Sequence, residues 1–173
     1  MSIEIDGLRD YCPCHKNEQA EYIGDGLDSV VYRVGKYAIK SYNTDLIGNR
    51  FFPINIEKLY LYEHITNNAS RLVKGKSLVL LLPFSKKEIP VEINPILELH
   101  ACKTCNQVES ISLYVHGVRG DASEKLFDTR ELGTALDDLN NKLEDELKVR
   151  GINIIPLNVK FLGSDLAIVT DLC

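Results

Sequence analysis

Residues 22–43 read YIGDGLDSVVYRVGKYAIKSYN, and they place two glycines ahead of two runs of β-branched and aromatic residues. The alternation of apolar and polar side chains predicts strands at about 21–24, 29–34 and 36–42, with Gly35-Lys36 as the last turn. Gly24 and Gly26 allow two interpretations. They form a plain hairpin with a loose turn, or a loop whose backbone N–H groups approach phosphate oxygens unhindered by side chains.

The remaining apolar patterns predict an α+β protein. Leucines repeat at steps of three and four after Asp128, which with Glu131 resembles a capping box, and Gly151 supplies a stop signal. Gly163-Ser164 separates two short apolar runs near the end, which predicts a hairpin. In chain order, the predicted elements after residue 43 are a helix at 54–66, strands at 77–83, 88–101 and 110–116, a helix at 129–150 and a hairpin at 152–173.

Size and composition bound the class of protein. The chain has 173 residues, 45% of them apolar, which suits one ordinary domain or two small lobes with a real interior. A net charge of −5 without any basic block argues against a nucleic-acid partner. No apolar leader begins the chain, and its longest apolar run, at 77–84, is too short to cross a membrane. We therefore expect a cytoplasmic protein with no membrane partner.

The stretch around Lys40 resembles the N-lobe of the protein-kinase family. Gly24, Gly26 and Val31 match its glycine-rich loop, with Ser29 where the third glycine usually stands, and YAIK at 37–40 matches its V-A-I-K strand. The resemblance implies that Ala38 and Val31 contact a nucleotide and that Lys40 binds its phosphates. It also implies a carboxylate partner for Lys40 on the next helix, for which Glu57 is the candidate and Glu63 the reserve. The alternative is that Lys40 extends to solvent and that Glu57 is an exposed helix residue.

Further family landmarks follow in the expected order. HGVRG at 116–120 resembles the hinge, where the peptide groups of His116 and Val118 would bind adenine. Asn158 and Asp171, thirteen positions apart, match the spacing of the family's two magnesium ligands, which implies ATP with Mg²⁺ as cofactor. The resemblance thus implies an N-terminal arm at 1–20, a kinase-like N-lobe at 21–117 and a minimal, truncated C-lobe at 118–173.

Two departures from the family bear on activity. The position of the catalytic aspartate is occupied by Asn153, whose amide cannot accept a proton as a carboxylate does. The sequence ends two residues after Asp171, before the segments that bind a protein substrate. We therefore expect a pseudokinase that binds a partner protein. One alternative is an active minimal kinase using another base, for which the candidates are Asp121, Glu124 and Asp165.

Four of the five cysteines form two compact clusters, Cys12 with Cys14 and Cys102 with Cys105. Four thiolates from two such clusters are a usual donor set for structural Zn²⁺, which would fasten the arm to the sheet. Reduced surface thiols or one disulfide would explain the same residues. A zinc-stapled α+β adaptor that binds no nucleotide is accordingly the third candidate function.

Overall fold

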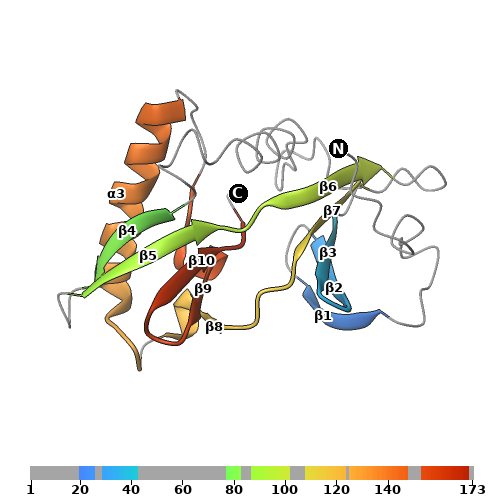
Figure 1. The fold of residues 1–173 in the computed structure, drawn as a ribbon, viewed down its shortest axis with the longest axis horizontal. Helices are drawn as coiled ribbons and strands as arrows, with labels where there is room; N and C mark the ends of the chain where they lie inside the picture. Colours follow the sequence, from blue (N-terminus) through green and yellow to red (C-terminus); the bar gives the residue numbers. More distant parts are fainter. Residues whose placement is uncertain are drawn as a thin grey trace. The chain divides into compact units, whose positions relative to one another are not determined.

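The computed structural model describes residues 20–25, 29–42, 77–82, 87–101, 108–123, 125–147 and 153–171. They form a mixed α+β protein with two five-stranded sheets and, within those ranges, one α-helix (Figure 1). The chain divides into two compact units. The first comprises Met1–Glu63 and Pro95–Tyr114, and the second comprises His64–Asn94 and Val115–Cys173.

The sheet of the first unit is antiparallel throughout, with the strand order β1-β2-β3-β7-β6. A tight turn at Gly35, whose φ of 59° lies in the left-handed region that favours glycine, joins the second strand to the third, as predicted. The strands are β1 (Glu21–Asp25), β2 (Ser29–Val34), β3 (Tyr37–Tyr42), β6 (Ile96–Ala101) and β7 (Val108–Leu113).

Both faces of this sheet carry buried side chains. On one face, Ile39 and Ile111 lie opposite each other in β3 and β7 and are essentially inaccessible. On the other face, Tyr42 packs with Val108 and Leu99. Since residues alternate between the faces of a strand, β3 contributes to both clusters and is the central strand of the unit.

The second unit combines a mixed sheet with the helix, and the strand order is β4-β5-β10-β9-β8. The predicted C-terminal hairpin forms β9 and β10, with Gly163 at φ 62° in its turn. The elements are β4 (Ser77–Leu82), β5 (Lys87–Ile93), β8 (Val118–Arg119), the 3₁₀ turn η2 (Gly120–Ala122), α3 (Thr129–Leu147), the 3₁₀ turn η3 (Pro156–Asn158), β9 (Val159–Leu162) and β10 (Leu166–Val169).

The helix buries the leucine stripe that its spacing predicts. Leu132, Leu136, Leu139 and Leu143 are each at most 5% exposed. In the sheet, residues on one side of β5 and β10 are equally buried, among them Ile89, Val91 and Val169. Phe127, just before the helix, packs on Phe161 of β9 with the ring centroids 4.4 Å apart. This apolar layer holds the hairpin in place.

The prediction of one strand over 88–101, placed in the N-lobe sheet, is wrong. The chain forms two strands there, β5 and β6, and they belong to different sheets. The break falls at Asn94-Pro95, where proline has no N–H to continue a ladder. β5 pairs in parallel with β10, so the predicted C-terminal hairpin of β9 and β10 is part of a larger sheet rather than a separate element. The predicted helix at 54–66 lies outside the described residues.

Candidate functional site

Four of the predicted nucleotide-binding residues lie on one face of the first unit's sheet. Val31 in β2 is paired directly with Lys40 in β3. Ser29 and Ala38 are two positions before them in their own strands, and side chains two apart share a face. The structure therefore brings Ser29, Val31, Ala38 and Lys40 together on the face that also carries Tyr42.

Lys40 lies beside an aromatic ring on that face. Its ammonium nitrogen is 5.1 Å from the ring centroid of Tyr42, within the range of a cation–π interaction. The hydroxyl of Tyr42 is 3.4 Å from Oγ of Ser110, the residue paired with Lys40 in β7. The side chain of Lys40 is half-buried on this face.

The glycine-rich loop is described only in part. Gly24 lies in β1, where the pairing with β2 shifts register between Tyr22 and Gly24. A Cβ atom on Gly24 would meet nothing within 4 Å, so packing does not require glycine at this position. Gly26 and Glu57 lie outside the described residues, as does the reserve candidate Glu63.

The two predicted magnesium ligands lie at one end of the β9–β10 hairpin. Asn158 ends η3 directly before β9, and Asp171 follows Thr170 after β10. The backbone N–H of Thr170 donates to the carbonyl of Asn158 at 2.7 Å, and the Thr170 hydroxyl donates to the same oxygen at 3.2 Å. Amide and carboxylate oxygens are the donors that Mg²⁺ takes in proteins, so the residue types fit this ion.

The segment resembling a hinge lies in the second unit. His116 and Val118 have exposed side chains, and Val118 pairs with Phe161 of β9. Between them Gly117 passes so close to β9 that a Cβ atom would be 2.6 Å from the carbonyl oxygen of Phe161. The binding of adenine by the peptide groups at 116 and 118 stays a prediction.

The candidate bases are held in other interactions or lie outside the described residues. Asp121 accepts two hydrogen bonds from Arg119, at 2.9 and 2.5 Å, which lower the pKa of its carboxyl group. Asp165 is bonded to Lys87, which lowers its pKa in the same way. A lowered pKa makes each carboxylate a weaker proton acceptor. Glu124 is outside the described residues, and Asn153 is exposed.

Neither the predicted zinc site nor a membrane span is found in the described ranges. Cys12, Cys14, Cys102 and Cys105 all lie outside them, so zinc stays a prediction. The described residues contain no group of three or more His, Cys, Asp or Glu side chains that could hold a metal ion. In the same part of the chain, no helix is long and apolar enough to cross a bilayer.

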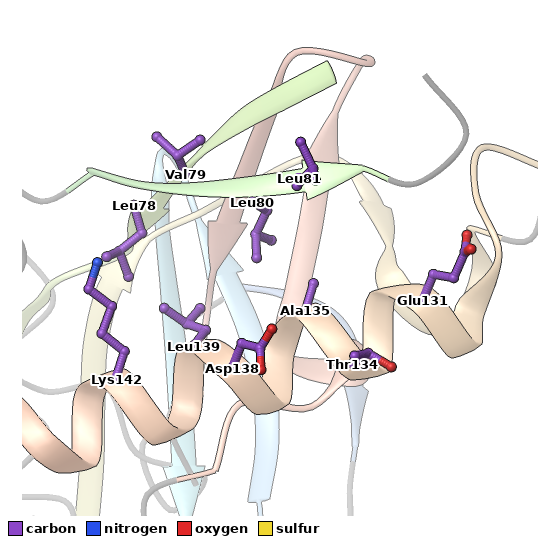
Figure 2. Close-up of a pocket in the computed structure, with 10 residues that line it drawn as sticks. All are labelled: Leu78, Val79, Leu80, Leu81, Glu131, Thr134, Ala135, Asp138, Leu139 and Lys142. Carbon is purple, nitrogen blue, oxygen red and sulfur yellow. The ribbon is translucent and has the colours of Figure 1, made fainter. Parts of the chain in front are cut away.

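A groove separates β4 from α3 in the second unit (Figure 2). Leu78 and Leu80 point from β4 toward the helix, whereas Val79 and Leu81 project from the opposite side of the strand and are 61% and 60% exposed. Charged side chains of both signs line the helical wall. These are Glu131, Asp138 and Lys142.

Two asparagines near the candidate magnesium ligands were not predicted as functional. Asn94, only 7% exposed, follows β5, and its backbone N–H donates to the carbonyl of Val169 at 2.8 Å. Asn140 in α3 bonds the backbone of Ile154 twice. The sequence gives little indication of these contacts, because neither asparagine belongs to a recognisable motif and each hydrogen-bond partner is far along the chain.

No known protein family and no curated protein matches this sequence. Among solved structures, the chain is similar to one described as "PpkA-294 apo form", at 16% sequence identity and a TM-score of 0.44. The similarity covers 95% of this chain and 62% of that one, so the chain spans about three fifths of the length of the structure it matches.

Proposed function

We propose that this protein is a kinase-like domain that binds ATP with Mg²⁺, does not transfer phosphate efficiently, and acts by binding a partner protein. The observation that carries the proposal is the hydrogen bond from Thr170 N to Asn158 O. It holds the backbone of Asn158 next to the segment that carries Asp171, so one residue with an amide side chain and one with a carboxylate lie at the same end of the hairpin. A divalent cation that bridges nucleotide phosphates requires oxygen donors of this kind.

The face of the first unit supports the same proposal. Val31 and Ala38 are small apolar residues on the same face of the sheet as Lys40, and a nucleotide needs apolar contacts for its base and a cation for its phosphates. The pairing of Val31 with Lys40 is part of a continuous antiparallel ladder. The positions of these side chains relative to one another are therefore set by the backbone and need no ligand.

The residue at the base position argues against efficient phosphate transfer. Asn153 has a neutral amide, which cannot take the proton of an attacking hydroxyl. The two described carboxylates that could substitute, Asp121 and Asp165, are bonded to Arg119 and Lys87 with lowered pKa values. A domain that binds a nucleotide without turning it over would act by recognising a partner protein.

Thermal unfolding with ATP and Mg²⁺ tests the proposal. Ligand at 100 times its dissociation constant should stabilise the protein by about 2.7 kcal/mol and raise the melting temperature. Lys40→Met and Asp171→Ala should each reduce the shift strongly, whereas Lys36→Met, which changes an exposed lysine in the neighbouring turn, should leave it intact. A wild-type protein that shows no shift would favour the zinc-stapled adaptor, which metal analysis would then identify.

Incubation with a γ-labelled nucleotide separates the pseudokinase from an active kinase. We expect no transfer above the level of Asp171→Ala. Rapid labelling that disappears in this variant would overturn the pseudokinase proposal and favour a kinase with a relocated base. The nucleotide-binding proposal would survive that result.

A further inference from the structure

Asn140 joins α3 to the segment that leads to Asn158. Its Nδ2 donates to the carbonyl of Ile154 at 2.9 Å, and its Oδ1 accepts the N–H of the same residue at 2.6 Å. One side-chain amide thus satisfies both peptide groups of Ile154, in the manner of a neighbouring strand. The two residues are fourteen positions apart in the sequence, so this contact links separate elements rather than closing a local turn.

Both ends of this contact are firmly packed. Leu136 and Leu143, one helical turn on either side of Asn140, are 1% exposed. The side chain of Ile154 is also 1% exposed. Residues 153–155 belong to no helix or strand, so their backbone has no ladder of its own to hold it. The amide of Asn140 supplies the hydrogen bonds that regular structure would otherwise supply.

The contact continues directly to the candidate magnesium ligand. The carbonyl of Ile155, the residue after Ile154, accepts the N–H of Asn158 at 2.8 Å. Asn158 in turn accepts the N–H of Thr170. A short series of hydrogen bonds therefore runs from the helix through residues 154–158 to the residue before Asp171.

We infer that Asn140 is a positioning residue, which sets the place of Asn158 by holding the backbone of Ile154 against α3. The expected effect of Asn140 on Mg²⁺-dependent nucleotide binding rests on the proposed function. Removing a residue that orients a metal ligand through a hydrogen bond lowers metal affinity about 10- to 100-fold. Asn140 does not contact the ligand oxygens and has no catalytic role in this inference.

Three substitutions follow from the two hydrogen bonds between Asn140 and Ile154. Asn140→Ala removes the donor and the acceptor and leaves both peptide groups of Ile154 without this partner. Asn140→Asp keeps an acceptor for the N–H but loses the donor to the carbonyl, so it should behave as an intermediate. Asn141→Ala is the matched control, because it changes the same residue type in the same helix at an exposed position.

Two measurements on the full chain test the inference. The first is amide hydrogen exchange at Asn158 and Thr170 without ligand, which needs no assumption about function. We expect protection at both amides to fall at least about tenfold in Asn140→Ala, to fall less in Asn140→Asp and to be unchanged in Asn141→Ala. The second is the Mg²⁺ concentration needed for half-maximal ATP binding, which should rise about tenfold in Asn140→Ala. ATP binding without metal should change little.

The outcomes distinguish the two proposals. Unchanged exchange at Asn158 and Thr170 in Asn140→Ala would overturn the positioning role, whatever the protein binds. A uniform loss of protection throughout the chain would also overturn it, because Asn140 would then serve global stability only. Local loss of protection in a protein whose wild type shows no Mg²⁺-dependent ATP binding would retain the positioning role and refute the proposed function.

Discussion

Among the glycines that the structure describes, Gly120 leaves the least room for a side chain. A Cβ atom at this position would be 2.4 Å from the carbonyl oxygen of Pro156, the first residue of η3. Gly120→Ala should therefore force the two segments apart and destabilise the protein by about 1–3 kcal/mol. Urea unfolding followed by circular dichroism measures this change.

Gly133 provides the control of opposite sign. It lies inside α3, and a Cβ atom there would meet nothing within 4 Å. Gly133→Ala should stabilise the protein by about 0.5–1 kcal/mol, since alanine is the better helix former. Equal effects of the two substitutions would show that the close approach at Gly120 is not maintained in solution.

At the residue scale, the sequence predicts a site only where a local pattern sets the geometry. Val31 and Lys40 face each other because a two-residue turn at Gly35 fixes the register of their strands, and that turn is visible in the sequence. Asn140 gave no such signal, because its partner Ile154 is chosen by how the helix packs. A side chain that forms hydrogen bonds with a distant backbone group produces no periodic pattern in the sequence.

At the scale of one element, the predicted cap at the N-terminus of α3 can be tested. Oδ1 of Asp128 accepts the backbone N–H of Arg130 at 2.8 Å, so Asp128 is the N-cap residue. Asp128→Ala should cost about 0.5–2 kcal/mol, because one N–H of the first turn loses its acceptor. Asp137→Ala, an exposed aspartate in the middle of the same helix, should change the unfolding midpoint far less. Similar losses in both variants would assign the effect to charge.

The elements themselves were largely predictable, whereas their assignment to sheets was not. The turn of β2 and β3, the hairpin of β9 and β10 and the helix α3 all follow from local periodicity, and the structure confirms them. The parallel pairing of β5 with β10 brings Ile93 beside Val169 and depends on long-range packing. For this reason the apolar stretch at 88–101 looked like one strand of one sheet.

For the molecule as a whole, two surface ion pairs predict a loss of stability in acid. Arg119 lowers the pKa of Asp121 by hydrogen bonding, and Lys87 lowers that of Asp165. Because the folded-state pKa is the lower one, each pair stabilises the folded state above the ordinary carboxyl pKa. This stabilisation is lost as the pH falls through the folded value. The urea midpoint should decline below about pH 4.

The urea midpoint of the double variant Asp121→Asn, Asp165→Asn should fall less than that of wild type as the pH is lowered; that is, the acid limb of its stability curve should be flatter. Both pairs are exposed, so the difference should be modest and should shrink further in high salt. The double variant Asp137→Asn, Asp138→Asn, at two exposed positions of α3, is the control for the same change of net charge. An Asp121→Asn, Asp165→Asn variant with the same acid limb as wild type would show that these pairs do not contribute.

The division of the chain into two interleaved units has a consequence for biosynthesis. The polypeptide passes from one unit to the other three times, at 63/64, 94/95 and 114/115. During translation, β4 and β5 are made before β6 and β7, yet β10, the parallel partner of β5, is the last of the described strands to be made. The first unit can complete its sheet once residue 114 has emerged. The second must wait for residue 169, and until then the edge of β5 that β10 covers is open to chaperones or aggregation.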